Sequence, residues 1–296
     1  MHNPKTDWCF KTEPDETMNN RSINYPRGKT LGGSSSINGL LYIRGQEQDY
    51  DTWRQLGNVG WSWKDVLPYF LKSENQERGE SEFHGVKGPI SVEDQRIQLD
   101  ILDVFMNAAE EIGIPKVNDF NKGNNFGCGY FQVTEKKGLR CSASVGYLKP
   151  IKNRKNLKII TEAPVSKVLL DGKRAIGVVI QSKMKTKKKI FSKEVILSAG
   201  SIMSPVILMR SGIGDADILR ASGIEIEHHL SGVGKNLQDH VQCIIYTKSK
   251  SRKAYGISLP VMPKLAWWTL DYLIRRQGLL ASNIFESGGF FKTDPK

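Results

Sequence analysis

The 296-residue sequence lacks any apolar run close to the roughly 20 residues that a membrane-spanning helix requires. Its opening residues, MHNPKTDWCF, also lack the basic segment and apolar stretch of a signal peptide. We therefore expect no membrane span, and the compartment stays unknown.

Cysteine is scarce, and no two cysteines have the C-x-x-C spacing of a zinc or redox site. The four thiols lie far apart, at Cys9, Cys128, Cys141 and Cys243. This spacing predicts no metal site. Scattered buried thiols are the expectation, although a disulfide is left open.

Acidic residues are fewer than basic ones, 31 against 43, which gives a formal net charge of +12. A dense lysine run, residues 183–189, could bind nucleic acid. Alternating apolar residues before it (176–180) and Ile190 after it indicate instead two strands joined by a polar turn. Because no aromatic residue interleaves with the lysines, as stacking on bases would require, we favour the hairpin and expect no nucleic-acid partner.

The hydrophobic pattern predicts a mixture of helices and strands. Helices are expected over residues 62–77, 97–112, 201–211, 215–222 and 262–277. Strands are expected over residues 157–160, 165–170, 175–180 and 194–198, while residues 1–26 look irregular. In the first helix, Ser62 and Asp65 have the spacing of a capping box, and Gly113 is placed to end the second.

Glycine, by contrast, is abundant, with 28 residues that gather in two clusters. The first runs from Gly28 to Asn38 and combines glycines with three serines, which suits close backbone contact with a polyoxygen ligand. The second runs from Gly200 to Gly214; it follows the strand expected over residues 194–198 and contains the helix expected over residues 201–211. A strand, a small-residue turn and a helix form a ligand crevice in α/β sheets. Taken singly, the first cluster could also be a Gly/Ser-rich surface turn, and the second a plain strand–helix packing unit.

Together the two clusters resemble the two signatures of the glucose-methanol-choline (GMC) oxidoreductase family, in the family's order. The first signature fits from Gly28 through Asp51 and the second from Gly200 through Gly214. Further family-like stretches are residues 8–14, 49–53, 60–61, 67–70, 140–142 and 233–240. The resemblance covers essentially the whole chain, and its details look most like the animal glucose dehydrogenase branch.

The resemblance implies an α/β fold, with an FAD-binding Rossmann-like domain followed by part of a second, α+β substrate domain. It implies FAD as cofactor, an alcohol or sugar as hydride donor, and a quinone or oxygen as electron acceptor. The implied cofactor-binding residues are Gly28, Leu31, Gly32, Gly33, Ser34, Ser35, Asn38, Gly39, Leu40, Leu41, Val165, Ala199, Gly200, Asp239 and His240. Many family members are extracellular.

Two family features are missing from the sequence. No G-x-G-x-x-G turn precedes Gly28, and no histidine matches the catalytic motif that the family carries near its carboxyl end. We therefore expect a partial chain, with the first βαβ unit missing, an FAD-binding region over residues 1–240 and a truncated substrate domain over 241–296. No catalytic residue is expected among the five histidines, His2, His84, His228, His229 and His240. The chain alone should show no dehydrogenase turnover, and a non-catalytic flavin-scaffold binding protein is the alternative.

The aromatic residues of the last expected helix leave two interpretations open. Trp267, Trp268 and Tyr272 could line a pocket mouth, but packing in an apolar core is the interpretation we favour. The substrate itself is not specified by the sequence.

Overall fold

The computed structural model describes residues 3–181, 186–240, 242–245 and 262–293. The chain divides into two compact units: unit 1 comprises Met1–Leu157 and Lys248–Lys296, and unit 2 comprises Lys158–Thr247. The family-based boundary after residue 240 stays a prediction, because compact units in space and family domains need not coincide.

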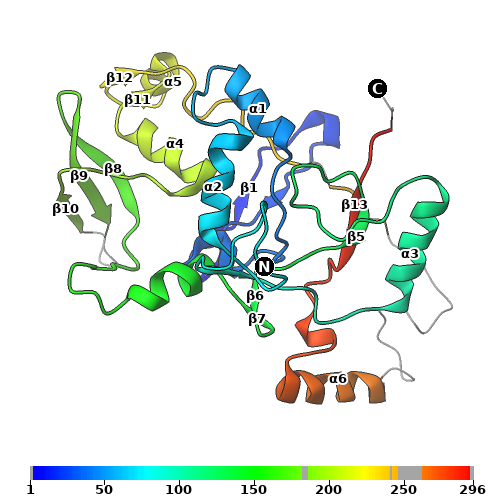
Figure 1. The fold of residues 1–296 in the computed structure, drawn as a ribbon. Helices are drawn as coiled ribbons and strands as arrows, with labels where there is room; N and C mark the ends of the chain where they lie inside the picture. Colours follow the sequence, from blue (N-terminus) through cyan, green and yellow to red (C-terminus); the bar gives the residue numbers. More distant parts are fainter. Residues whose placement is uncertain (1–2, 182–185, 241, 246–261, 294–296) are drawn as a thin grey trace. The chain divides into compact units, whose positions relative to one another are not determined.

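Unit 1 contains four α-helices and several short two-stranded sheets among its described residues (Figure 1). The helices are α1 (Glu47–Gln55), α2 (Trp63–Ser73), α3 (Asp100–Glu111) and α6 (Met262–Arg275). The strands are β1 (Phe10–Lys11), β2 (Asn24–Tyr25), β3 (Glu74–Gln76), β4 (Ile90–Val92), β5 (Gly127–Tyr130), β6 (Glu135–Lys136), β7 (Leu139–Arg140) and β13 (Ser287–Phe290). β1 pairs with β2, β3 with β4, β5 with β13 and β6 with β7, and only β3–β4 is parallel.

Short helical turns complete unit 1. They are η1 (Glu16–Met18), η2 (Gly33–Ser36), the π-helical turn η3 (Ser144–Leu148), η4 (Lys149–Ile151) and η6 (Leu279–Ala281).

The capping signals of the first two predicted helices are confirmed. Ser62 Oγ accepts a hydrogen bond from the Asp65 amide at 3.3 Å, and the Asp65 carboxylate accepts one from the Ser62 amide at 3.1 Å. Gly113 follows α3 with φ at +88°, a backbone conformation that glycine adopts without strain.

The boundaries of these helices differ from the prediction. α2 ends at Ser73, and residues 74–76 form β3, because the buried Glu74 side chain is drawn into an ion network and its backbone pairs with Ile90. α3 begins at Asp100 rather than at residue 97. Ile97 is buried, but it packs from the segment before the helix.

The expectation that residues 1–26 are irregular is wrong. β1 and β2 form an antiparallel hairpin there, with Phe10 opposite Tyr25. The carboxylate of the buried Asp7 accepts hydrogen bonds from the amides of Cys9 and Arg27, at 2.9 and 3.0 Å. The pairing partners lie more than ten residues apart, so local patterns do not reveal them.

Unit 2 is built around a three-stranded antiparallel sheet in the order β10–β9–β8 (Figure 1). Its elements are β8 (Val165–Asp171), β9 (Arg174–Gln181), β10 (Lys187–Phe191), α4 (Gly200–Arg210), β11 (Ile213–Gly214), α5 (Ala216–Ala221) and β12 (His228–His229). The predicted hairpin is confirmed, but residues 187–189 belong to β10 itself rather than to the turn. Lys183 and Lys185 lie outside the described residues.

Two predicted strands are not present. Residues 157–160 and 194–198 form no strand, and no described segment pairs with either. A strand needs a partner for its backbone hydrogen bonds, so an apolar sequence alone does not produce one.

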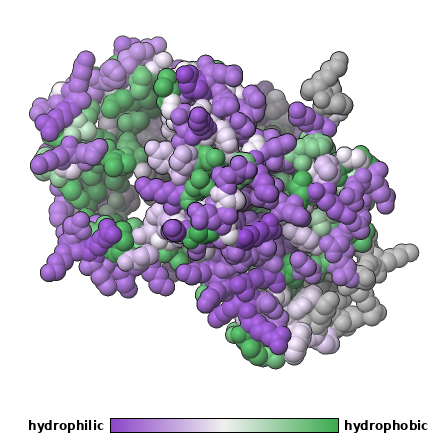
Figure 2. Space-filling view, in the orientation of Figure 1, coloured by the Kyte–Doolittle hydropathy of each residue, from purple (hydrophilic) through white to green (hydrophobic). Residues whose placement is uncertain are grey.

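Figure 2 shows apolar side chains at the surface of unit 2, around β8 and α4.

The four cysteines are free thiols. Cys128 and Cys141 are buried as expected, whereas Cys243 is exposed. Within the described residues, no helix has the length and apolar character needed to cross a membrane, and no cluster of three or more His, Cys, Asp or Glu side chains is arranged to hold a metal ion.

Candidate cofactor-binding site

The first glycine cluster folds into a tight loop around η2. Gly32 and Gly33 both have positive φ angles, +88° and +55°. At Gly28, a Cβ atom would lie 2.2 Å from the carbonyl oxygen of Gly33, so any side chain there would collide with the backbone. The loop therefore requires glycine at Gly28 for close packing and favours it at Gly32 and Gly33 for conformation.

The serines of this loop hold its own backbone. Ser34 Oγ accepts a hydrogen bond from the Gly28 amide at 3.2 Å, and Ser36 Oγ donates to the Leu31 carbonyl at 2.8 Å. Ser35 Oγ donates to the Gly32 carbonyl at 2.5 Å. These bonds fix the loop in one conformation without using a distant partner.

Gly33 differs from its neighbours because it faces open space. No atom outside its immediate neighbours lies within 4 Å of the position that a Cβ would occupy. The cap residue of η2, Gly32, also has no side chain to satisfy the first amides of that turn. A ligand with anionic oxygens can therefore approach this backbone closely.

A distant segment clamps the middle of the loop. Arg140 Nη1, on β7, donates to the Ser35 carbonyl at 3.1 Å and to Asn38 Oδ1 at 2.8 Å. The Ala143 amide donates to Ser35 Oγ at 2.9 Å. The loop is thus positioned by residues about a hundred positions away, which are buried or partly buried themselves.

The end of the loop is attached in the same way. Thr134 donates to the Leu40 carbonyl through its amide, at 2.8 Å, and through its hydroxyl, at 3.1 Å. The Asn283 side chain donates to the Gly39 carbonyl at 2.6 Å. Leu40 is buried and has a positive φ of 66°.

A buried acid without a hydrogen-bond partner lies beside the arginine clamp. Glu135, on β6, is directly opposite Arg140 on β7, and its Oε2 atom is buried with no partner. Burial, reinforced by the nearby Glu93 carboxylate, raises the pKa of Glu135 to about 7, although Arg96 and Arg140 oppose the shift. Glu135 therefore titrates near neutral pH.

A second buried acid in unit 1, Glu74, is fully paired. Its side chain is 0% exposed and accepts from Arg44 Nη2 at 2.8 Å and from His84 Nδ1 at 3.1 Å. His84 Nε2 contacts the Asp119 carboxylate at 2.8 Å. Burial lowers the pKa of His84, but the hydrogen bonds with Asp119 and Glu74 outweigh it and raise the pKa to about 9.

None of the described histidines is placed in the structure as an obvious base. Both ring nitrogens of His84 face carboxylates, so neither is available to take a proton. His228, His229 and His240 are exposed, and His229 Nδ1 accepts from the Ala216 amide at 3.1 Å. His2 lies outside the described residues.

The remaining predicted site residues belong to unit 2. Val165 begins β8. Ala199 is the residue before α4, and Gly200 is the first residue of that helix. Gly200 has a φ of +86° and open space beside it. Asp239 and His240 are exposed, and the Asp239 carboxylate accepts from the His240 amide at 2.9 Å. The structure thus brings Gly28 to Leu41 together in unit 1 and the other five in unit 2.

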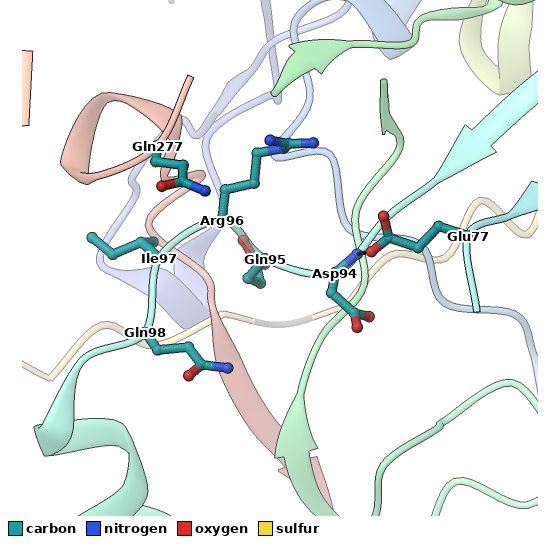
Figure 3. Close-up of a pocket in the computed structure, with 7 residues that line it drawn as sticks. All are labelled: Glu77, Asp94, Gln95, Arg96, Ile97, Gln98 and Gln277. Carbon is teal, nitrogen blue, oxygen red and sulfur yellow. Dashed lines mark hydrogen bonds between the residues drawn. The ribbon is translucent and has the colours of Figure 1, made fainter. Parts of the chain in front are cut away.

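Unit 1 also contains a polar pocket of about 410 Å³ that sequence reasoning did not predict (Figure 3). It is lined by Glu77, Asp94, Gln95, Arg96, Ile97, Gln98 and Gln277. Arg96 in this pocket bonds Glu93 at 3.0 Å, the same acid that raises the pKa of Glu135.

In α6, the expected core packing is wrong for Trp267, which is 61% exposed.

Comparison with known proteins gives consistent results. Residues 14–242 match the family model described as GMC oxidoreductase. The chain is 42% identical over 295 residues to an alcohol dehydrogenase [acceptor] from Pseudomonas putida, and 38% identical over 297 residues to an oxygen-dependent choline dehydrogenase from Stenotrophomonas maltophilia. Each match covers 99% of this chain and 53% of the relative. The chain therefore spans about half the length of these curated relatives.

A solved structure has the same fold. An FAD-dependent oxidoreductase from Chaetomium thermophilum superposes with a TM-score of 0.82 at 29% identity, over 95% of this chain and 52% of that one.

Proposed function

Because the chain belongs to the GMC oxidoreductase family, we propose that it forms the FAD-binding part of an oxidoreductase that acts on CH–OH groups of small molecules. The observation that carries the proposal is the loop from Gly28 to Leu41, with open space beside the backbone of Gly33. The matches to dehydrogenases over nearly the whole chain support it.

The residues of the loop fit FAD in a specific order. The stretch from Gly32 to Ser35 would lie along the pyrophosphate and ribityl chain, because small residues allow an anionic group to approach the backbone closely. Asn38 to Leu41 would lie against the isoalloxazine ring. The anchoring bonds to Gly39 and Leu40 would keep this stretch rigid when the cofactor binds.

The other contacts are proposed from the family resemblance alone. Val165 would face the adenosine end through its main chain, Ala199 and Gly200 would border the cofactor, and Asp239 and His240 would lie near the flavin pocket. FAD, when bound, supplies the acceptor for the hydride of the alcohol carbon.

The substrate and the electron acceptor are proposed at the level of chemical class. The relatives are named as alcohol and choline dehydrogenases, so the donor is proposed to be a small alcohol or sugar and the acceptor a quinone or oxygen. The glucose dehydrogenase subtype is a finer proposal that rests on the sequence resemblance alone.

FAD titration of the 296-residue chain tests the proposal, with flavin fluorescence as the readout. We expect Gly33→Ala to weaken FAD binding at least about tenfold, because a methyl group would occupy the space through which the cofactor approaches the backbone.

Gly172→Ala is the matched control. Gly172 lies in the β8–β9 turn with a φ of +54°, close to the +55° of Gly33, and also faces open space. The two variants therefore carry the same backbone strain, about 1–2 kcal/mol. Equal FAD affinities of the two variants, or no FAD binding by the folded wild-type chain, would contradict the proposal.

A further inference from the structure

Arg140 is the one described residue whose side chain bonds two separate groups of the cofactor loop. A single nitrogen, Nη1, donates both to the Ser35 carbonyl and to the Asn38 side chain. These two acceptors bracket the end of η2, where the loop turns from its glycine stretch toward Leu40. Any change in the position of the Arg140 guanidinium must therefore change the loop.

Glu135 is the ionisable group directly opposite Arg140 on the neighbouring strand. The other charged groups that act on Glu135 are Glu93 and Arg96, from the segment after β4. Arg96 is already engaged, since it bonds the Glu93 carboxylate through Nε and Nη2 at 3.3 and 3.0 Å. Of the two cations that act on Glu135, Arg140 is thus the one that is not already paired with another acid.

The environment of the buried Oε2 atom of Glu135 favours the protonated carboxyl over the carboxylate. A protonated carboxyl without a partner costs less in a buried place than a carboxylate does. When Glu135 ionises, its charge gains most by drawing Arg140 toward β6. That movement would weaken the bonds from Arg140 to Ser35 and Asn38.

We propose that Arg140 is a positioning residue for the cofactor loop and that proton loss from Glu135 releases the loop from it. The proposal rests on the proposed function, because the loop is taken to hold the FAD pyrophosphate. With Glu135 protonated, Arg140 keeps its positive charge unneutralised and holds the loop in the binding conformation. With Glu135 ionised, the pair is neutral and the loop is looser.

Both effects act in the same direction on FAD affinity. A neutral Glu135 leaves one more positive charge near an anionic ligand, and it keeps the loop pre-organised. We expect the dissociation constant for FAD to rise roughly tenfold between pH 6 and pH 8.5, as two opposite unit charges come to cancel near the ligand.

Glu135→Gln is the decisive variant, because the amide has the shape of the protonated acid and cannot ionise. We expect it to bind FAD at pH 8.5 as tightly as the wild-type chain does at pH 6, with no pH dependence over this range. Arg140→Lys keeps the charge but loses the geometry of the guanidinium. It should bind FAD more weakly at both pH values.

Arg96→Gln serves as the matched control. Arg96 lowers the pKa of Glu135 but bonds no group of the cofactor loop. Its removal should move the pH midpoint upward while leaving the low-pH affinity unchanged. If Glu135, Arg140 and Arg96 had a purely structural role, their substitutions would instead weaken FAD binding equally at every pH.

Hydrogen exchange of the chain without FAD separates this proposal from the proposed function. We expect the protection of amides in residues 33–42 to fall above pH 7 in the wild-type chain and to stay constant in Glu135→Gln. If FAD does not bind but this exchange pattern appears, the clamp stands and the FAD function fails. If protection and FAD affinity follow the same pH course in both chains, the clamp is refuted. A melt monitored by circular dichroism confirms that each variant is folded.

Discussion

Two of the buried glutamates in unit 1, Glu74 and Glu135, are in opposite situations. Glu74 is 0% exposed and bonded to Arg44, His84 and the Gly85 amide, whereas Glu135 is 4% exposed and has a buried oxygen with no partner. A fully satisfied acid fixes one conformation and resists change. An acid that lacks a partner is poised between two protonation states, so the same residue type serves as a structural support in one place and as a possible control element in the other.

The largest expected effect comes from breaking the paired site, which is the Glu74 carboxylate with its partners Arg44 and His84. Glu74→Gln should lower the free energy of unfolding by about 3–5 kcal/mol, because it leaves the buried Arg44 and His84 charges without their shared partner. Urea denaturation at pH 7 measures this. Glu110→Gln is the control, since it breaks only the exposed pair with Lys116 and should cost less than about 1 kcal/mol. Equal losses in both variants would contradict the comparison.

The paired site also predicts a stability loss in alkali. The pKa of His84 is raised from its ordinary 6.5 to about 9, so the folded state binds its proton more tightly than the unfolded chain does. The resulting stabilisation, about 2–3 kcal/mol, is fully present below pH 6.5 and is lost as the pH rises to about 9. Denaturation midpoints from pH 6 to 10 should show this fall, and His84→Gln should remove it. A variant that keeps the wild-type slope would assign the fall to other groups.

The smallest expected effect comes from Glu135, whose buried Oε2 atom has no partner. Replacing this residue should stabilise the protein, whereas replacing Glu74 should destabilise it. The pKa of Glu135 is raised to about 7, so its contribution to stability is present below about pH 4.5 and is lost as the pH rises to about 7. Glu135→Gln should therefore be more stable than the wild-type chain at pH 8, by about 1–2 kcal/mol, because it removes a buried charge. Thermal or urea melts at pH 5 and pH 8 measure the difference. A destabilised variant at pH 8 would show that Glu135 is paired after all.

Local signals in the sequence predicted much of the secondary structure. The capping box at Ser62, the stop at Gly113 and the hairpin of β9 and β10 all depend on residues close together in the chain. The glycine loop was also located, because glycine and serine at that density have a conformational meaning of their own.

The partners of that loop could not be predicted in the same way. In the sequence, Arg140 belongs only to a family-like stretch, and no local pattern predicts its bonds to Ser35 and Asn38. Asn283 is 244 positions from Gly39. The prediction of strands at residues 157–160 and 194–198 was wrong for the same reason, because strands depend on partners that local apolar patterns do not reveal.

The central claim is that the loop from Gly28 to Leu41 binds FAD. Hydrogen exchange of the chain with and without saturating FAD tests it directly. We expect FAD to slow amide exchange in residues 28–42 and around Gly200, and to leave the β8–β9 turn at Gly172 unaffected. A folded chain in which FAD leaves residues 28–42 unchanged would contradict it.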